Sequence, residues 1–263
     1  MITVITGVGD GIAGPAAIAL AQRGHRLVLV GRTPEKVAAV ADRAAGFGPR
    51  PEVLTCDFTH LDRVRKLAAE LRARHGRIDV LVNNAGVMTT ARTLTSDGHE
   101  TMFQVNHLAP FLLTTLLLDR LADGRVVTTT SRAAKSGRLD LGDLDRERRR
   151  WSGWLQYGDT KQANALFTVE LARRGVAATC FHPGLIKTGF APGTLMMRLI
   201  HHVPGMGRSP EEGAATMIHL ADGPDGVEHA GRYFVDRAPA AAPRSMTDPD
   251  LARRLWDVTA AAV

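Results

Sequence analysis

The chain opens with an apolar run, Ile2-Thr3-Val4-Ile5-Thr6, that continues directly into the glycine-rich stretch Gly7-Val8-Gly9-Asp10-Gly11-Ile12-Ala13-Gly14. The run predicts a buried strand, and a helical pattern follows from Pro15 to Arg23. Gly7 permits a tight turn, Gly11 lets the backbone approach a pyrophosphate, and the helix N-terminus favours the negative charge of phosphates. A strand, a glycine-rich turn and a helix in this order predict a dinucleotide site, the alternative being a turn without a ligand. Its cofactor-binding residues would be Gly7, Gly9, Asp10, Gly11 and Ile12.

Five further apolar runs continue the alternation of strand and helix along the chain. They are Arg26–Val30, Glu52–Cys56, Asp79–Val82, Arg125–Thr130 and Val176–Phe181. Because these runs are continuous rather than alternating, they predict a parallel sheet that is covered on both faces. No linker rich in proline or serine divides the 263 residues. We therefore predict one α/β domain over residues 1–263, a doubly wound Rossmann fold with a parallel sheet of about seven strands and helices on both faces.

The end of the second predicted strand bears on the choice between the two nicotinamide cofactors. An acidic residue there would hydrogen-bond the adenosine ribose of NAD, but this chain has Gly31 and then Arg32. A guanidinium can pair with a 2′-phosphate, so Arg32 favours NADP(H) over NAD(H), the alternative being a surface arginine that opens a helix. Asp57 ends the third strand at the same edge, where it can accept a bond from the adenine amino group, cap the next helix, or do both. The negative charge of Asp10 opposes phosphate binding, and the sequence gives no reason for it.

The composition is that of a globular protein with a sizeable core. Hydrophobic residues make up 44% of the chain and its formal net charge is +6. The basic residues are scattered except for Arg146 and Arg148–Arg150, which a solvated loop explains at least as well as a nucleic-acid patch. Cys56 and Cys180 lie in apolar runs, as buried thiols do, and form neither a disulfide framework nor a metal-ligand spacing. No stretch reaches about 18 uncharged apolar residues and Met1 directly precedes the first strand, so we expect a soluble cytoplasmic protein without signal peptide, membrane span, metal or nucleic-acid partner.

Three polar residues farther along the chain suit proton transfer at a carbonyl or an alcohol. Tyr157 and Lys161 are four positions apart, which places the phenol and the ammonium on one face of a helix. A free tyrosine titrates near ~10, and a fixed cation beside it favours the phenolate and lowers that pKa. Ser131, just after an apolar run, can hold a substrate oxygen against the phenol. Taken alone, this spacing also fits an amphipathic surface pair.

Together these segments resemble the short-chain dehydrogenase/reductase superfamily over the full length of the chain. The closest resemblance is to its retinol-dehydrogenase-like and protochlorophyllide-reductase-like branch. The matching segments occur in the order and spacing of that family: Thr6–Ala13, Asp57, Asn83–Gly86, Val105–Leu108, Ser131, Tyr157–Lys161, His182–Gly184, Thr188, Gly231–Phe234 and Leu251–Trp256. The chain departs from the family pattern at Gly9, where many relatives carry serine, at Ala13 in place of a third glycine, and at Thr128–Thr130.

The resemblance implies a role for each matched residue. Ser131 positions the substrate oxygen, Tyr157 donates or accepts the proton, and Lys161 bonds the nicotinamide ribose while lowering the pKa of the tyrosine. Asn106 distorts its helix and holds a water that links Lys161 to solvent, the alternative being a structural polar residue. The catalytic residues would then be Ser131, Tyr157, Lys161 and Asn106. Beyond the glycine-rich turn, the cofactor-binding residues would be Arg32, Asp57, Asn84, Ala85, Gly86, Asn106, Tyr157, Lys161, Pro183, Gly184, Ile186 and Thr188.

The implied reaction is reversible hydride transfer between a nicotinamide and a carbonyl carbon, in the direction of reduction if NADPH is the cofactor. Thr194–Val203 is rich in soft apolar side chains and falls in a substrate-covering segment expected at about residues 190–210. It implies an apolar, bulky ketone or aldehyde, although a core helix fits its spacing equally well. The long loop Gly137–Gln156 is typical of the same branch and is expected to shape the mouth of the site.

Other functions stay open at this point. A catalytically silent NADP-sensing module would keep the glycine-rich turn but would have little need for Ser131, Tyr157 and Lys161 together. An NAD-preferring alcohol dehydrogenase would keep the site without a role for Arg32. An epimerase or dehydratase uses the same tyrosine and lysine but usually has a larger C-terminal domain. Relatives often pair through the helices that contain Asn106 and Tyr157, so a homodimer, a homotetramer and a monomer are all open.

Overall fold

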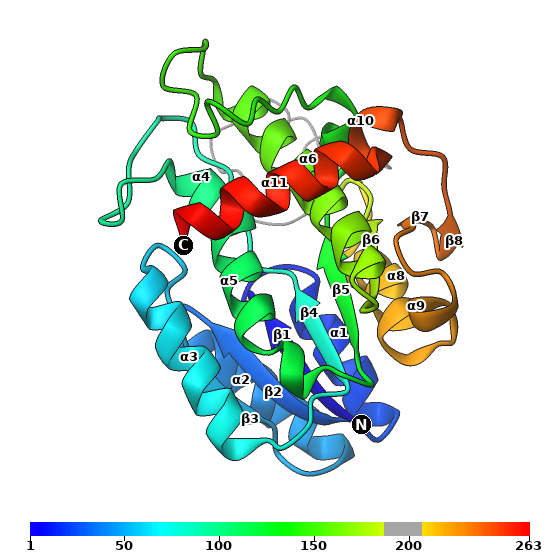
Figure 1. The fold of residues 1–263 in the computed structure, drawn as a ribbon. Helices are drawn as coiled ribbons and strands as arrows, with labels where there is room; N and C mark the ends of the chain where they lie inside the picture. The colour runs from blue at the N-terminus through cyan, green and yellow to red at the C-terminus, as the bar shows by residue number, and fades with distance from the viewer. Residues whose placement is uncertain (187–206) are drawn as a thin grey trace.

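The computed structural model, which describes residues 1–186 and 207–263, holds an eight-stranded sheet in the order β3-β2-β1-β4-β5-β6-β7-β8 (Figure 1). β1 pairs with β2 on one side and with β4 on the other, both in parallel, so the strand order reverses between β1 and β4. The strands are β1 (Ile2–Thr6), β2 (Arg26–Gly31), β3 (Glu52–Thr55), β4 (Val80–Asn83), β5 (Arg125–Thr129), β6 (Ala177–His182), β7 (Tyr233–Val235) and β8 (Ala238–Pro239).

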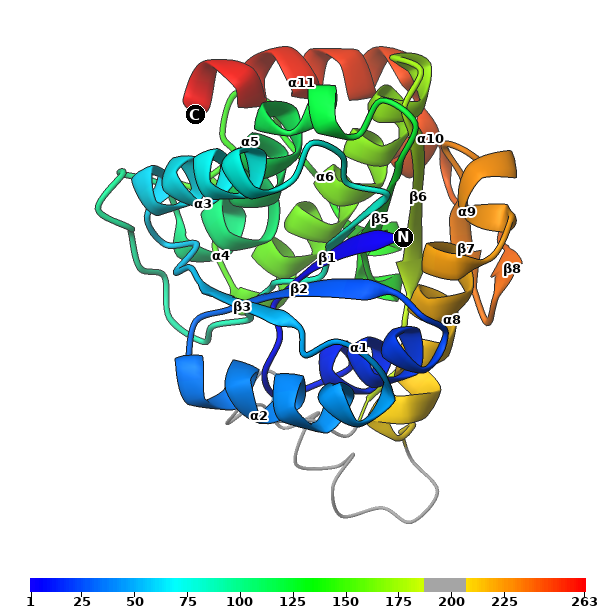
Figure 2. The ribbon, with the colours of Figure 1, turned by 90° about the horizontal axis from the view of Figure 1, so that it is seen from below.

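Helices cover both faces of this sheet because successive side chains of each strand point to opposite faces and both sets are apolar. On β1, for example, Val4 packs in one hydrophobic cluster and Ile5 in the other, and both are fully buried. Figure 2 shows α1, α2 and α8 on one side of the strands and α3, α5 and α6 on the other. These helices are α1 (Ala13–Gln22), α2 (Pro34–Ala44), α3 (Leu61–Arg74), α5 (Ala109–Leu116), α6 (Gly153–Arg173) and α8 (Pro210–Asp222).

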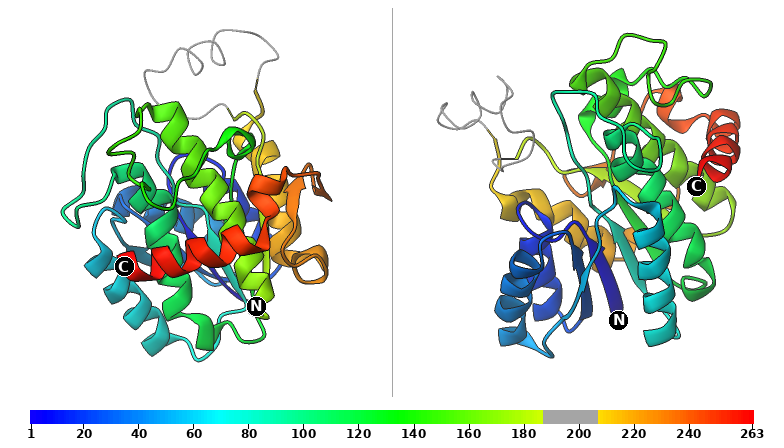
Figure 3. Two further views of the ribbon diagram at one scale, coloured as in Figure 1. Left: turned by 45° about the horizontal axis from the view of Figure 1, so that its top comes forward. Right: turned by 90° about the vertical axis from the view of Figure 1, so that its left-hand side faces the viewer.

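The C-terminal helix α11 (Pro249–Ala262) adds a fourth layer, since it lies across the outer side of α5 and α6 (Figures 1 and 3). The Trp256 ring lies 4.8 Å from that of Phe111 and 5.8 Å from that of Phe167, centre to centre. The guanidinium of Arg174 lies 4.0 Å over the same indole. The N-cap Asp248 accepts hydrogen bonds from the first amides of the helix. Aromatic burial of this kind makes α11 part of the core rather than a surface appendage.

A turn of π-helix, η2 (Gln104–Leu108), joins α4 (Thr101–Phe103) to α5. The helix is therefore distorted at Asn106, and the extra residue in this turn changes the direction in which the following side chains point. Its neighbour His107 is buried among the rings of Phe103, Phe111 and Phe167. This turn matters for the site because both Asn106 and His107 contact α6.

The predicted doubly wound Rossmann fold is confirmed, with one difference at the edge of the sheet. The sheet has eight strands instead of about seven, and the additional strand β8 is antiparallel to β7. The connecting residues Asp236 and Arg237 have φ values of 52° and 65°. A two-residue hairpin turn of this kind usually contains glycine or asparagine, so the sequence carried no signal for it. In residues 1–186 and 207–263, no helix combines the length and apolar character needed to cross a membrane.

Candidate active site

The predicted site residues gather at the carboxyl ends of the central strands, where the strand order reverses. Gly7 follows β1, Asn84 follows β4, Ser131 lies two residues after β5, and Pro183 follows β6. In an open parallel sheet, the crevice outside these strand ends is the usual place for a ligand. The topology therefore brings together residues that lie far apart in the sequence.

The first turn is fastened to the end of β4. The Thr6 hydroxyl accepts hydrogen bonds from the backbone amides of Asn84 at 3.0 Å and Ala85 at 3.2 Å. Gly7 has a φ of 71°, and a Cβ atom on it would lie 2.6 Å from Ala85 Cα. Any other residue at position 7 would therefore combine backbone strain with a clash against main-chain atoms. The close approach makes the predicted residues Gly7, Asn84 and Ala85 one rigid unit.

The rest of this turn leaves space of the kind that a pyrophosphate needs. Gly11 has a φ of 121°, and a Cβ atom there would have no heavy atom within 4 Å. No side chain caps α1, so its first amide groups are available to an anion. At the end of β2, a Cβ atom on Gly31 would lie 2.2 Å from Val8 O, so only glycine lets this strand reach the turn. These residues fit a nicotinamide dinucleotide whose phosphates would lie against Gly9, Gly11 and Ile12.

Charged side chains surround the outer end of this turn. Asp10 forms an ion pair with Lys36 in the first turn of α2, which supplies the explanation of Asp10 that the sequence lacks. Arg32 is exposed, and no ion pair within residues 1–186 and 207–263 neutralises it. Lys36 is a residue that sequence reasoning missed, although its position four residues after Arg32 was a usable signal.

Asp57 lies at the same edge and holds the turn that precedes α3. Its Oδ1 accepts hydrogen bonds from Thr59 N at 3.0 Å and Thr59 Oγ1 at 2.8 Å. Burial by itself would raise the pKa of Asp57, but the Thr59 hydrogen bonds and the nearby charge of Arg32 bring it below its ordinary value. The alternative role as cap of α3 is wrong, because Leu61 N at the start of that helix donates to Asp97 Oδ2 instead.

Ser131, Tyr157 and Lys161 come together beside the dinucleotide turn. Ser131 caps the short helix η4 (Arg132–Ser136) by accepting a hydrogen bond from Ala133 N at 3.2 Å. Its side chain also hydrogen-bonds the Tyr157 phenol. One turn farther along α6, Lys161 Nζ lies 5.6 Å from the centre of the Tyr157 ring. Ser131 and Tyr157 are half-buried and Lys161 is buried, so a ligand can reach the hydroxyl groups in front of a concealed cation.

Burial moves the proton affinities of this pair in opposite directions. It raises the pKa of Tyr157 to about 12, which the Ser131 hydrogen bond only partly opposes. It lowers the pKa of Lys161 to about 8. The expected lowering of the tyrosine pKa by the lysine is therefore not found for the protein by itself, where burial of the phenol outweighs the opposing hydrogen bond of Ser131. That ammonium donates a hydrogen bond to Thr129 O, at 3.1 Å.

Asn106 links the loop after β4 to the helix that carries Tyr157 and Lys161. Its Oδ1 accepts a hydrogen bond from Val87 N at 2.7 Å, and its Nδ2 donates to Val87 O at 2.9 Å and to Thr160 Oγ1 at 3.1 Å. A Cβ atom on Gly86 would lie 3.3 Å from Asn106 Oδ1 and 3.4 Å from Lys161 Nζ. The predicted residues Gly86, Asn106 and Lys161 thus form one continuous wall of the site.

Most of the predicted residues after β6 lie at the same edge. A Cβ atom on Gly213 of α8 would lie 2.5 Å from Ile186 Cδ1 and 2.8 Å from Ile12 Cγ2, so these two predicted cofactor residues are neighbours. Pro183 and Gly184 directly follow the strand, and the φ of Gly184 is 92°. The remaining predictions for this region, Thr188 and the substrate-covering stretch Thr194–Val203, lie outside the described residues.

His182 is a further site residue that sequence reasoning missed as an individual contact. Its Nδ1 accepts a hydrogen bond from Arg132 N at 3.2 Å, which fixes the backbone directly after Ser131. Burial, with help from the charge of Arg132, lowers the pKa of His182 to about 4. The imidazole is therefore neutral at pH 7 and acts as an acceptor. A polar residue that ends an apolar strand was the available signal.

The arginine cluster of the loop Gly137–Gln156 is solvated only in part, since Arg148 and Arg150 are exposed whereas Arg146 is buried. Arg146 is 5% exposed and pairs with the fully buried Asp159 of α6 at 2.8 Å. Arg149 contacts the same carboxylate at 3.5 Å and Asp143 at 3.0 Å. Asp159 also accepts a hydrogen bond from Arg138 N at 2.7 Å. The expectation of a solvated loop is wrong for Arg146 because Asp159, two residues after Tyr157, draws its guanidinium into the interior.

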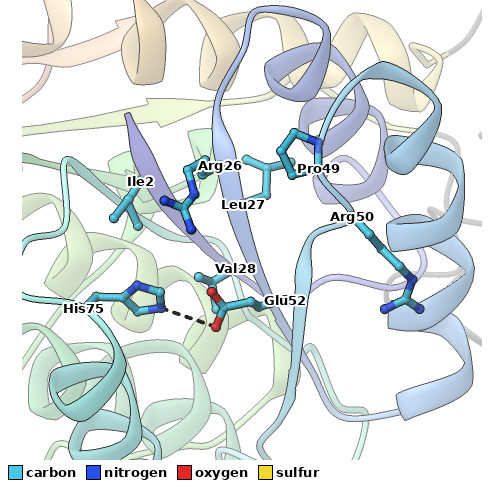
Figure 4. A pocket seen from close by; sticks show the side chains of 8 residues that line it. All are labelled: Ile2, Arg26, Leu27, Val28, Pro49, Arg50, Glu52 and His75. Carbon is cyan, nitrogen blue, oxygen red and sulfur yellow. Dashed lines mark ion pairs between the residues drawn. The ribbon is translucent and has the colours of Figure 1, made fainter.

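A small cavity of about 50 Å³ lies at the other end of the sheet (Figure 4). Its lining includes Ile2, Arg26 and Glu52, which are the first residues of β1, β2 and β3. His75 points toward Glu52 across it, with 3.5 Å between Nε2 and Oε2. Because the candidate active site lies at the carboxyl ends of the strands, this cavity is not part of it.

Known proteins resemble this chain in sequence and in fold. The family model for short chain dehydrogenase matches residues 1–195. A protein of Streptomyces sp. (strain C5), provisionally named daunorubicin C-13 ketoreductase DnrU, is 43% identical over 263 residues, 99% of this chain and 91% of that protein. Human retinol dehydrogenase 11 is 36% identical over 98% of this chain and 84% of its own length.

Solved structures agree with the sequence matches. An uncharacterized protein from Mycobacterium paratuberculosis superposes with a TM-score of 0.78 at 31% identity, covering 99% of this chain and 92% of its own. The Pseudomonas aeruginosa RhlG/NADP active-site complex gives a TM-score of 0.67 at 25% identity, covering 89% and 93%. With these matches and the strand order in hand, the chain belongs to the short-chain dehydrogenase/reductase family, in its retinol-dehydrogenase-like branch, and is an oxidoreductase.

Proposed function

We propose that the protein reduces the carbonyl group of a bulky, apolar ketone or aldehyde to an alcohol, with NADPH as the hydride donor. The observation that carries this proposal is the hydrogen bond between Ser131 and the protonated phenol of Tyr157, next to the buried ammonium of Lys161. Two hydroxyl groups that contact one another at the accessible edge of the sheet can bind the same substrate oxygen. That arrangement serves proton transfer to a carbonyl oxygen and has no use in a module that only senses a cofactor.

Each residue of the site has a separate role in the proposed reduction. The nicotinamide, when bound, supplies the hydride to the carbonyl carbon. Ser131 stabilises the negative charge that develops on the carbonyl oxygen, and Tyr157 delivers its proton to that oxygen. Because the pKa of Tyr157 is about 12, the phenol is protonated throughout the neutral range and is ready to act as an acid. Lys161 then balances the charge of the phenolate, and Asn106 keeps the wall of the site in place.

The charges around the first turn support NADP(H) as the cofactor. Arg32 places a cation near the position expected for the adenosine ribose, Lys36 neutralises Asp10, and no acidic residue ends β2 to receive a ribose hydroxyl. Arg32 is exposed and forms no ion pair within the described chain, although its charge is felt by Asp57, so its guanidinium can pair with a 2′-phosphate. The NADP complex of RhlG, a structural neighbour at 25% identity, is consistent with this choice.

The names of the relatives support a large apolar substrate. One relative is named for a ketone of daunorubicin and another for retinol, and both molecules are bulky and have a large apolar part. The most informative test therefore measures NADPH oxidation over a panel of aliphatic, aromatic and polycyclic carbonyl compounds that includes daunorubicin and retinal. Turnover of bulky apolar members is expected. Tight NADPH binding without turnover of any carbonyl would instead support the sensing module.

A pair of tyrosine variants tests the mechanism, since the chain has only two tyrosines. Tyr157→Phe removes the proton donor and is expected to lower kcat by about 10²- to 10⁴-fold while NADPH still binds. Tyr233→Phe is the matched control, because the Tyr233 hydroxyl is buried and has no hydrogen-bond partner in the described part of the chain. Full reductase activity in the Tyr157→Phe variant would overturn the mechanism.

A further inference from the structure

A series of buried hydrogen bonds leads from Lys161 to the C-terminal helix. Lys161 Nζ and Asn164 Nδ2 both donate to Thr129 O, at 3.1 Å and 3.4 Å. Asn164 Oδ1 lies 3.3 Å from His107 Nδ1, and His107 Nε2 lies 3.1 Å from Thr259 Oγ1 of α11. All five residues are buried, with Thr259 fully so. The series therefore runs through the interior of the protein and connects β5, α6, η2 and α11.

The donors of this series point in one direction. The reverse orientation of the Asn164 amide would place its oxygen against Thr129 O, so the amide nitrogen faces that carbonyl and the oxygen faces His107. His107 must then carry its proton on Nδ1. Burial lowers the pKa of His107 to about 4, so the ring is neutral and Nε2 is an acceptor for the Thr259 hydroxyl. Each group in the series thus donates toward Thr129 O, the carbonyl that holds the Lys161 ammonium.

The same π-helical turn holds α6 at two positions. Asn106 reaches Thr160 and His107 reaches Asn164, which lie one turn apart on the helix. Lys161 lies between those two positions in the sequence. Two consecutive side chains therefore fix α6 on either side of Lys161, and the π-helical geometry is what allows both to face it.

We propose that Thr259, His107 and Asn164 are positioning residues for Lys161, through which the C-terminal helix keeps the ammonium in its working position. The ammonium depends on Thr129 O for its anchor, and Asn164 restrains that carbonyl from the other side. Misplacement of a reacting group by about 1 Å can reduce a rate by about 10²-fold, so a remote hydroxyl can affect catalysis without touching substrate. The kinetic consequence rests on the proposed function, whereas the hydrogen-bond series does not.

Three threonine variants test this proposal. Thr259→Val keeps the shape and removes the hydroxyl, and Thr259→Ser keeps the hydroxyl. Thr3→Val is the matched control, because Thr3 is also fully buried and its hydroxyl bonds His25 Nδ1 at 2.8 Å in the first strand. We expect Thr259→Val to lower kcat by about tenfold with little change in the KM for the carbonyl substrate. Thr259→Ser should have the kcat of the wild-type protein. Thr3→Val should lose as much thermal stability as Thr259→Val but keep its kcat.

Nuclear magnetic resonance gives a readout that needs no turnover. A long-range ¹H–¹⁵N spectrum of the cofactor-free protein should show His107 protonated on Nδ1, and the Lys161 side-chain signals should shift in Thr259→Val but not in Thr3→Val. A proton on His107 Nε2, or equal Lys161 signals in both variants, would overturn the inference. Inactivity of the wild-type protein toward every carbonyl would count against the proposed function alone. The spectra would still test the positioning role of Thr259, His107 and Asn164.

Discussion

Asp10 places a carboxylate in a turn that is expected to receive phosphates, and Lys36 compensates it. The ion pair of these residues keeps the net charge of the turn from opposing an anionic ligand. Arg32 forms no ion pair in the described chain, so its charge remains available to a ligand. At the scale of single residues, we therefore expect Lys36 to offset the charge of Asp10 and Arg32 to provide selectivity for NADP(H) over NAD(H). This division can be measured because each cation has a different expected effect on the two cofactors.

Arg32→Ala is expected to weaken NADPH binding by about 10- to 100-fold, the value of a charge-assisted contact to a phosphate, and to leave NADH binding unchanged. Lys36→Ala should weaken both cofactors, since it also leaves Asp10 uncompensated, and Asp10→Ala should restore NADH binding to that variant. Titration calorimetry with both cofactors measures each effect. Arg26→Ala, at the opposite end of β2, is the control. Equal losses of affinity for NADH and NADPH in Arg32→Ala would contradict the role of Arg32 in selecting NADPH.

At the scale of elements, the long loop before α6 is tied to the catalytic helix by a buried charge. Asp159 lies between Tyr157 and Lys161 in the sequence, and its carboxylate holds both Arg146 and the backbone of Arg138. Arg146 has a φ of 46°, so the loop takes a strained conformation in order to reach this partner. The loop that is expected to border the substrate is therefore held against the same helix as the proton donor.

Removal of one partner of the buried ion pair between Asp159 and Arg146 should strongly destabilise the protein. Asp159→Ala leaves the Arg146 guanidinium buried without a counter-charge, and we expect the free energy of unfolding to fall by about 3–5 kcal/mol. Urea denaturation monitored by circular dichroism would measure the change. Asp62→Ala removes an ion pair at the surface, where Asp62 is 84% exposed, and should change stability by less than about 1 kcal/mol. A loss in Asp159→Ala no larger than that of this control would show that the pair does not hold the loop.

At the scale of the whole molecule, two buried neutral histidines make the fold sensitive to mild acid. Burial lowers the pKa of both His107 and His182 to about 4, from an ordinary value of 6.5. Between those values the unfolded chain binds protons that the folded protein does not, so the free energy of unfolding decreases as the pH falls from 6.5 toward 4. Each histidine accounts for about 3 kcal/mol of this decrease. Below about pH 4 the histidines contribute no further loss.

His107→Gln removes one of these two groups and should make the dependence of stability on pH between 6.5 and 4 less steep, by about 1.4 kcal/mol per pH unit. Chemical denaturation at a series of pH values measures this slope. Carboxylates with lowered pKa values, such as Asp79 and Asp143, lose their contribution only below their ordinary value of 3.8, so they do not interfere in this window. An unchanged slope in the variant would mean that His107 titrates normally.

The sequence predicts much of this architecture because most of it depends on local patterns. Continuous apolar runs predicted six of the strands, and the glycine-rich turn marked the edge of the sheet where Ser131, Tyr157 and Lys161 meet. The contacts behind the site were beyond such reasoning, because they join residues far apart in the chain. His107 and Thr259 are separated by 152 positions and Asn106 and Thr160 by 54. The raised pKa of Tyr157 was also missed, since it depends on burial rather than on the spacing to Lys161.

The fourth layer formed by α11 has a consequence for how the chain is made. A ribosome synthesises every strand of the sheet before it reaches α11, so the nascent protein can become compact while Phe111 and Phe167 still lack the indole of Trp256. During that interval the outer side of α5 and α6 presents apolar rings to solvent, which is the kind of surface that chaperones bind. Docking of α11 would then have two effects at once. It covers the apolar surface that chaperones bind, and it completes the hydrogen-bond series that supports Lys161.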